Sequence, residues 1–340
     1  MLHTIAKLTA NLDLDVAANS IMERFYQSTR TRGSHFERRF QILSYHKVSP
    51  DAHPFFPPIH PAVFEQQMQF LKSFYRVMSL QELVDRTACG DIPARSVAIT
   101  FDDGYRDNYE YAFPILKKYQ LPATVFVATG AIGTGEPIWH DRVFDAFRFA
   151  TVDRARLKDS LIPELMLETV DARSCSLEPV LARAKALYGG TRQSLVDDLE
   201  EKLRPHLPFD RNQRMLTWDQ VREMFSAGIE FGSHTVSHTI LSRLPELEIV
   251  RELQHSKEEL YGNLKTHISL FAYPNGKHGD FDDHAKSLVR DCGYSCAVTC
   301  CSGFNSPSSD IFALKRGLPW QTEIDVFRLK FFLQRHGLAS

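Results

Sequence analysis

The sequence predicts an α/β barrel in which parallel strands alternate with helices. Short β-branched runs are followed repeatedly by segments with apolar residues at helical spacing, and this alternation is typical of a parallel sheet with crossover helices. Seven or eight strands can be placed, which fits a (β/α) barrel. A length of 340 residues would also allow two domains, but barrels routinely fill a chain of this size.

The composition is that of a globular protein with a large core. Apolar residues make up 43% and charged residues 24%, and the net charge of -2 gives no global field that would attract nucleic acid or an anionic membrane. The six cysteines show no paired framework, which favours a reducing compartment. We see no signal-peptide pattern in residues 1–32 and no apolar run of transmembrane length. The sequence therefore predicts a cytoplasmic protein without a nucleic-acid partner.

The beginning of the chain is expected to lie outside the barrel. Residues 1–38 are predicted to form a helical or loosely ordered leader that ends in the stretch Arg30–Gly33. Apolar residues such as Ile21 suggest that the leader docks on the body of the protein. The barrel is then expected over residues 39–340.

The expected strands are short runs rich in β-branched or aromatic residues, each bounded by turn-forming residues. In chain order they are 41–46, 75–78, 97–101, 124–127, 229–233, 270–273, 295–299 and 312–315.

Spacing and capping residues mark the helices between these strands. Apolar residues recur at helical spacing over 64–71, and the pairs Ser79–Glu82 and Thr217–Gln220 have the spacing of capping boxes. Pro114 predicts that a helix over about 108–119 is kinked or starts late.

One long segment interrupts the alternation of strands and helices. Residues 139–214 are helical in composition, with a loop at Gly189–Gly190. We interpret this segment as an insertion in a barrel loop and expect it to act as a cap over the site.

Two adjacent carboxylates end the strand at 97–101. Asp102 and Asp103 follow a buried-type run, and Gly104 lets the backbone turn sharply. Successive side chains of a strand point to opposite faces, so neither carboxylate can enter the core without compensation. A pair of solvated acids at the start of a helix would have the same pattern, and the pair alone leaves both interpretations open.

A histidine pair far downstream favours the functional interpretation. His234 and His238 follow the strand at 229–233, and the ends of parallel strands meet at the edge where barrel active sites are built. Two histidines and one carboxylate form a typical catalytic zinc set. Thr235 stands where a zincin protease needs glutamate, which excludes that class of metalloprotease.

The two motifs resemble the first two motifs of the polysaccharide deacetylase group (NodB homology, carbohydrate esterase family four). They are Thr100–Tyr105 and Ser233–His238, and the resemblance spans about 41–320 without the inserted segment. It implies a distorted (β/α)7 barrel that removes N- or O-acyl groups from sugars with a divalent metal. Zn²⁺ is the expected ion, with Co²⁺, Ni²⁺ or Mn²⁺ as alternatives.

The resemblance also implies residue roles. Asp103, His234 and His238 would be the metal ligands, and Asp102 would be the general base. A base within reach of the attacking water contributes about 10²–10⁴-fold to such a reaction.

A third stretch, Phe271–Gly276, resembles the Arg-x-Pro-Tyr-Gly motif of the group. The resemblance implies that the backbone N–H of Asn275 is the oxyanion donor. Ala272 stands at the arginine position, so the usual partner of the base is missing from this motif. An ordinary Pro-Gly turn after a buried strand remains the alternative.

The general acid is expected near the other end of the chain. No late Leu-x-His motif occurs, but the strand at 41–46 ends in His46. Some relatives look circularly permuted with that strand first, which makes His46 the candidate acid. A buried histidine bonded to backbone is the alternative, and His278 is a weaker candidate acid.

Aromatic residues near the expected mouth are candidates for stacking on sugar rings. They are Tyr105, Tyr273 and Trp139, together with His140 and Trp218, although core packing would explain such residues equally well.

These observations predict a metal-dependent hydrolase that removes N-acetyl groups from a glycan or from a lipid- or nucleotide-linked precursor. One alternative is a related hydrolase of C–N bonds in small cyclic amides or ureides. The other is a glycan-binding protein that has lost catalysis, which the replaced arginine would favour. The sequence does not indicate an oligomeric state.

Overall fold

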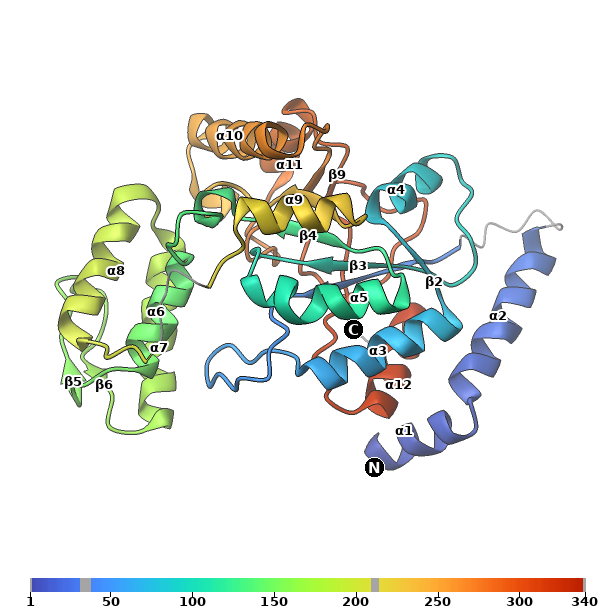
Figure 1. Cartoon of the computed structure of the whole chain (residues 1–340), viewed down its shortest axis with the longest axis horizontal. Helices are drawn as coiled ribbons and strands as arrows, with labels where there is room; N and C mark the ends of the chain where they lie inside the picture. The colour runs from blue at the N-terminus through green and yellow to red at the C-terminus, as the bar shows by residue number, and fades with distance from the viewer. Residues whose placement is uncertain (1, 31–37, 209–213, 339–340) are drawn as a thin grey trace.

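A parallel sheet of seven strands forms the centre of the protein. The computed structural model describes residues 2–30, 38–208 and 214–338. All neighbouring strands of this sheet are parallel, their order is β1-β3-β4-β7-β8-β9, and β2 pairs with β3. The strands are β1 (Gln41–Tyr45), β2 (Arg76–Met78), β3 (Ser96–Phe101), β4 (Thr124–Val127), β7 (Glu230–Ser233), β8 (Leu270–Ala272) and β9 (Cys296–Val298). Figure 1 shows the sheet in the middle of the molecule.

The segment after β9 closes the barrel toward β1. Leu314 bridges Val298 and Gly317 bridges Leu43, both in parallel fashion. The prediction of a continuous strand at 312–315 is therefore wrong. This segment forms only isolated bridges, the first to β9 and the next to β1. The predicted class, a distorted (β/α) barrel, is confirmed.

Helices cover the outside of the sheet. They are α3 (Pro61–Phe74), α4 (Leu80–Ala88), α5 (Phe113–Tyr119), α9 (Trp218–Ser226), α10 (Glu246–Leu264), α11 (Asp283–Asp291) and α12 (Ile324–Arg335). Short 3₁₀ turns lie at η2 (Thr129–Ala131) and η4 (Leu241–Arg243). The α-helix with Pro114 begins late, as predicted, because the turn before it, η1 (Asn108–Ala112), is π-helical.

The inserted segment folds beside the sheet around apolar residues of its own (Figure 1). It contains α6 (Trp139–Arg148), a short hairpin of β5 (Arg154–Ala155) and β6 (Leu165–Met166), α7 (Val170–Ala186) and α8 (Gly189–Leu203). Val143, Phe147 and Leu199 lie in its interior. Residues 209–213, near the predicted end of the insertion, lie outside the described residues.

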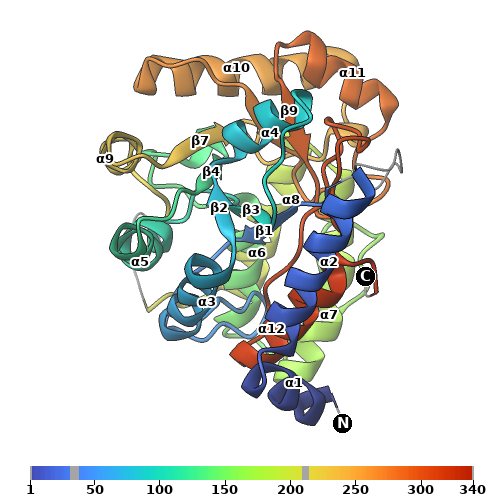
Figure 2. The same ribbon diagram turned by 90° about the vertical axis from the view of Figure 1, so that its right-hand side faces the viewer.

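Two helices precede the barrel, α1 (Leu2–Asn11) and α2 (Leu14–Arg30), and α1 lies beside α12 (Figure 2). Ala6 packs with Val326 and Leu329, and Arg328 binds Asp15 at 2.7 Å. The contact predicted for Ile21 is wrong, because this side chain is 67% exposed. Residues 31–37 of the predicted leader lie outside the described part of the chain. Within the described residues, no helix combines the length and the apolar character that a bilayer crossing requires.

Candidate active site

The two aspartates lie where β3 ends, at the edge toward which all strands of the sheet point. Asp103 and Gly104 both have positive φ angles, 76° and 86°, so the chain leaves the strand in a tight left-handed turn. A Cβ atom at Gly104 would lie 2.9 Å from Val127 and from Ile132. Glycine is therefore required here, and the turn that it makes holds both carboxylates in the site.

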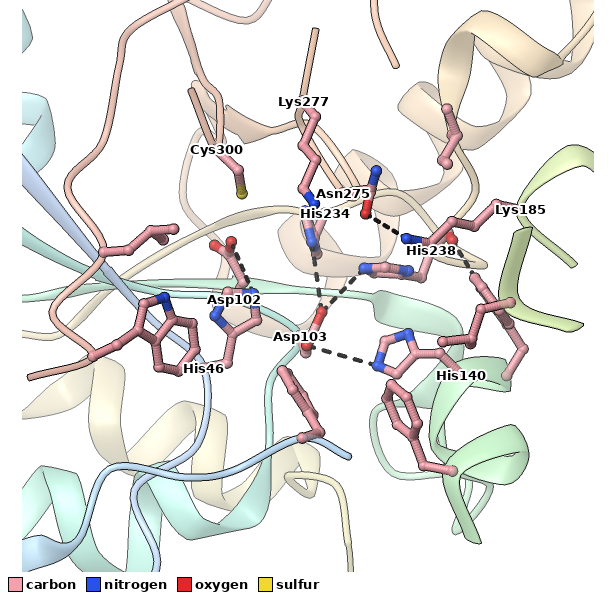
Figure 3. A pocket seen from close by; sticks show the side chains of 17 residues that line it. His46, Asp102, Asp103, His140, Lys185, His234, His238, Asn275, Lys277 and Cys300 are labelled. Carbon is pink, nitrogen blue, oxygen red and sulfur yellow. Dashed lines mark hydrogen bonds and ion pairs between the residues drawn. The ribbon is translucent and has the colours of Figure 1, made fainter. Parts of the chain in front are cut away.

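Asp103, His234 and His238 converge on one point. Their ligand atoms all lie within 4.8 Å of one another, and all three residues are buried. Asp103 Oδ1 lies 3.6 Å from His234 Nε2 and 3.2 Å from His238 Nε2. The sequence predicted this set, and Figure 3 shows the three side chains around a common centre.

The chemistry of this set fits a divalent metal. Asp103 Oδ1 is buried and has no hydrogen-bond partner, which would be costly unless a cation or proton engages it. His234 Nδ1 lies 2.7 Å from the carbonyl oxygen of Ala272, which leaves Nε2 to face the centre. Burial lowers the pKa of His234 to about 4, so the imidazole is neutral at pH 7, as a metal ligand must be.

Asp102 binds a buried arginine in bidentate geometry. Arg316 Nη1 and Nη2 donate to the two carboxylate oxygens of Asp102 at 2.7 and 2.6 Å. Arg316 also donates from Nε to the carbonyl oxygen of Thr299 at 2.7 Å, and its side chain is fully buried. The arginine missing from the motif at Ala272 thus has a counterpart from the segment that closes the barrel.

This pairing keeps Asp102 ionised. Burial alone would raise the pKa of Asp102, but the charge and hydrogen bonds of Arg316, together with His234 and His46, lower the pKa below the ordinary value. A buried carboxylate that is held in place and deprotonated at neutral pH has the properties of a general base.

His46 lies beside Asp102 at the end of β1. Its Nε2 is 3.8 Å from Asp102 Oδ2, and 18% of its side chain is exposed. The ring stacks on Trp320 at a centroid distance of 6.0 Å, and Asn108 donates to the backbone carbonyl of His46 at 2.8 Å. His46 Nδ1 is buried without a partner. His46 lines the cavity, and among the described residues its ring makes no hydrogen bond to backbone, unlike the alternative of a backbone-bonded histidine; its role as proton donor stays a prediction.

Asn275 lies in the loop after β8, across the site from His46, with a φ of 61°. Its side-chain amide donates to Asp280, and its Oδ1 accepts a hydrogen bond from Lys185 Nζ at 2.9 Å. Lys185 belongs to α7 of the insertion, which therefore reaches the predicted oxyanion loop.

The insertion also places His140 of α6 next to the triad. His140 Nε2 lies 3.9 Å from Asp103 Oδ2 and 2.9 Å from the hydroxyl of Tyr105. Trp139, its neighbour, donates from its indole to the carbonyl oxygen of His238 at 3.0 Å.

The metal-type triad, Asp102, His46, Asn275 and Lys185 border one cavity of about 360 Å³. Its polar lining includes His46, Asp102, Asp103, His140, Lys185, His234, His238, Asn275, Lys277 and Cys300 (Figure 3). Phe56, Trp139, Phe144 and Trp320 contribute aromatic walls.

Two aromatic residues differ from their predicted role in substrate binding. Tyr273 is fully buried and donates from its hydroxyl to the carbonyl oxygen of Phe312 at 3.0 Å, so it is a core residue. Tyr105 is 1% exposed, and its hydroxyl group is hydrogen-bonded to His140. Trp139 does line the cavity, whereas His278, the weaker candidate acid, is exposed on its loop.

Arg316 and Lys185 were not predicted as site residues. A signal for Arg316 existed, because it directly follows the expected strand at 312–315, just as Asp102 follows its own strand. Lys185 had no such signal, since an exposed lysine on a helix has the same sequence pattern.

Comparisons with known proteins concern the family and the fold. A sequence model of the polysaccharide deacetylase family matches residues 90–297. A poly-beta-1,6-N-acetyl-D-glucosamine N-deacetylase of Staphylococcus aureus is 46% identical over 71 residues, which cover 21% of this chain and only 24% of that protein. The Bacillus subtilis protein YxkH, provisionally named a polysaccharide deacetylase, is 22% identical over 280 residues, covering 82% of this chain and 70% of that protein.

Solved structures share the fold. The deacetylase PplD of Streptococcus pyogenes, in complex with acetate, has a TM-score of 0.58 at 22% identity and covers 87% of this chain and 98% of that chain. IcaB of Ammonifex degensii has a TM-score of 0.56 at 21% identity, with 87% and 97% covered. At these sequence identities, the similarity to the solved structures shows a shared fold only.

Proposed function

Because this chain belongs to the polysaccharide deacetylase family, we propose that it removes N-acetyl groups from sugar residues of a glycan with the help of a divalent metal ion. The observation that carries the proposal is the ion pair of Asp102 and Arg316 directly beside the Asp103, His234 and His238 triad. An ionised base and a metal-type ligand set in one cavity are what the hydrolysis of an amide requires.

Asp103, His234 and His238 would hold the metal ion. The two imidazoles and one carboxylate favour Zn²⁺, with Co²⁺, Ni²⁺ and Mn²⁺ as alternatives. When bound there, such an ion would polarise the acyl carbonyl and make water more acidic.

The other residues would handle protons and charge. Asp102, kept ionised by Arg316, would accept the proton of the attacking water. The backbone N–H of Asn275 would stabilise the negative charge that develops on the acyl oxygen. His46, beside Asp102 in the same cavity, would donate a proton to the leaving amine.

The proposed substrate is an N-acetylated glycan, or a glycolipid or nucleotide-linked precursor of one. The Staphylococcus aureus relative is named for a polymer of N-acetylglucosamine, which supports this class of sugar. The aromatic cavity walls suit the faces of sugar rings. The cytoplasmic location that the sequence predicts stays a prediction.

The test is acetate release from N-acetylglucosamine oligomers by the purified protein. We expect release to stop after chelation and to return when zinc or cobalt is added. Asp103→Asn should lose both bound metal and activity. Asp102→Asn should keep the metal and lose about 10²–10⁴-fold in turnover, since only the base is removed.

Two outcomes would contradict the proposal. Metal-loaded protein that releases no acetate from any N-acetylated oligomer would leave the cyclic-amide hydrolase and the binding protein as the remaining functions. Loss of metal in Asp102→Asn would overturn the division between base and ligand. The binding-protein alternative is already weakened, because the arginine whose absence favoured it has a counterpart in Arg316.

A further inference from the structure

One wall of the cavity carries two lysines. Lys185 lies in α7 of the insertion, and Lys277 follows Gly276 in the loop after β8. Lys185 is half-buried, whereas Lys277 is exposed at the rim. Both line the cavity that contains Asp103, and Figure 3 shows them on the side of Asn275. Two elements from different parts of the fold thus bring positive charge to the same wall.

Neither ammonium group has a carboxylate partner within the described residues. Lys185 Nζ donates to the neutral amide oxygen of Asn275 at 2.9 Å. The nearest acid along the loop, Asp280, is already engaged by the side-chain amide of Asn275 and by the backbone N–H of Lys277 at 2.9 Å. Burial and the charge of Lys277 lower the pKa of Lys185, so an added anion would stabilise its charged form.

The charges of the catalytic groups do not cancel these lysines. Arg316 neutralises Asp102, and a divalent ion would more than offset Asp103. The opposite side of the cavity is apolar and aromatic, with Phe56, Phe144 and Trp320. The cavity therefore has a wall with two ammonium donors, and Asp280, the acid whose charge acts on Lys185, is engaged by Asn275 and by the backbone of Lys277 rather than by either ammonium group.

We propose that Lys185 and Lys277 form a subsite for an anionic group on a sugar adjacent to the N-acetylated residue. The group would be a carboxylate or a phosphate, since both accept hydrogen bonds from ammonium donors. The inference rests on the proposed deacetylase function and names a narrower substrate class for it. The same wall disfavours sugars that already carry a free ammonium group, so extensively deacetylated chains would bind less well.

The experiment compares zinc-loaded full-length protein on three oligomer types. One is a neutral N-acetylglucosamine oligomer, the second alternates N-acetylglucosamine with glucuronic acid, and the third carries a phosphate monoester next to an N-acetylglucosamine. We expect kcat/KM for acetate release to favour an anionic oligomer over the neutral one by about tenfold or more, as for hydrogen bonds to charged groups. Whether the carboxylate or the phosphate oligomer ranks higher identifies the source of the anion.

Substitutions of the two lysines test whether this preference for anionic oligomers comes from them. Lys277→Met should lower the anionic-to-neutral ratio by about tenfold, and Lys72→Met, on the exposed surface of α3, should leave the ratio unchanged. Lys185→Met should lower the ratio as well. If it instead slows all oligomers equally while Lys277→Met leaves the ratio unchanged, Lys185 only positions Asn275 and the subsite is overturned.

Binding separates this inference from the proposed function. Calorimetry of the three oligomers with the Asp102→Asn protein measures affinity without turnover. Affinity for an anionic oligomer that depends on Lys277 would support the subsite even if no oligomer released acetate. Acetate release from the neutral oligomer, without any preference that depends on the lysines, would overturn the subsite and leave the deacetylase function standing.

Discussion

Arg316 shows how a single buried side chain determines the state of the base. Its guanidinium donates to both oxygens of Asp102, and both side chains are buried. Removing one partner of a buried pair leaves the other charge uncompensated, which costs about 3–5 kcal/mol. The ion pair of Asp102 and Arg316 therefore affects both the stability of the site and the protonation state of Asp102.

Substitution of Arg316 should change the pH dependence of the reaction. In the wild type, the pKa of Asp102 lies below its ordinary value, so the carboxylate is ionised across the neutral and mildly acidic range. In Arg316→Met, burial is no longer offset, so the pKa should rise and the acid limb of kcat/KM should move to higher pH. Turnover at pH 7 should fall by about 10²-fold or more. The measurement is kcat/KM from pH 4 to 9, together with bound metal.

Arg316→Lys and Arg86→Met serve as comparisons for this variant. Lysine keeps the charge but lacks the bidentate fork, so Arg316→Lys should shift the acid limb less. Arg86 pairs with Glu82 on the surface of α4, and its loss should change nothing in the profile. An acid limb that stays in place in Arg316→Met, with turnover retained, would show that another group controls the base.

At the scale of elements, α6 is the helix that fastens the insertion to the barrel. Its Asp141 is fully buried and accepts from Lys47 Nζ at 2.8 Å, and its Asp145 binds Arg214 at 3.0 Å. Lys47 lies in the loop after β1, so its pair with Asp141 joins the insertion to the barrel. The same helix carries Trp139 and His140 into the cavity, which makes the attachment of α6 a condition for a complete site.

Asp141→Asn should therefore loosen the insertion. Burial alone would raise the pKa of Asp141, but its cationic neighbours, Lys47 first among them, lower it below the ordinary value. The pair thus stabilises the fold above the unfolded-state pKa of about 3.9 and loses this contribution as the pH falls through the lower, folded-state pKa. We expect Asp141→Asn to cost up to about 3–5 kcal/mol at pH 7.

Urea unfolding at several pH values checks this expectation. The difference between wild type and Asp141→Asn should be constant above about pH 5 and should shrink below about pH 4. Asp219→Asn, an exposed position on α9, is the control and should differ from wild type by less than about 1 kcal/mol. A difference that grows on acidification would contradict the assigned role of Asp141.

Local sequence patterns predicted most of the helices and strands, because such an element depends mainly on residues that are close together in the sequence. The run before Asp102 is a strand, and the proline at 114 delays its helix, as expected. Arg316 and Lys185 could not be placed in the same way. Their partners lie far away in sequence, at Asp102 and Asn275, and only the closed barrel and the docked insertion bring them together. Tyr273 was misassigned because a buried and a substrate-facing tyrosine look alike in sequence.

At the scale of the whole molecule, the two ends of the described chain are fastened to each other. Arg328 of α12 binds Asp13 and the buried Asp15 next to the packing of α1 on α12. None of the residues of this contact borders the cavity. The helices before the barrel are thus held by this charged contact, by a small apolar one, by the contact of His3 with Glu323, and by hydrogen bonds of Asn19 with Tyr75 and His336.

Arg328→Ala should release these helices without affecting catalysis. Asp15 would be left buried without its cationic partner, and the apolar contact of Ala6 and the hydrogen bonds of Asn19 would have to hold the helices without this ion pair. We expect faster cleavage before residue 38 in limited proteolysis, with acetate release unchanged within about twofold. Arg222→Ala removes an exposed pair on α9 and should leave the digestion pattern as in wild type. Equal proteolysis of Arg328→Ala and wild type would show that other contacts hold the leader.

The closure of the barrel has a consequence for how the protein matures during synthesis. All three proposed metal ligands have been synthesised by residue 238, but Arg316 is separated from Asp102 by 214 positions and comes from the last segment to join the barrel. Until this segment has docked, Asp102 lacks the cation that pairs with it, which favours the protonated form of the carboxyl group. The enzyme would become competent only when its C-terminal part has docked, so incomplete chains that bind metal would remain inactive toward glycans.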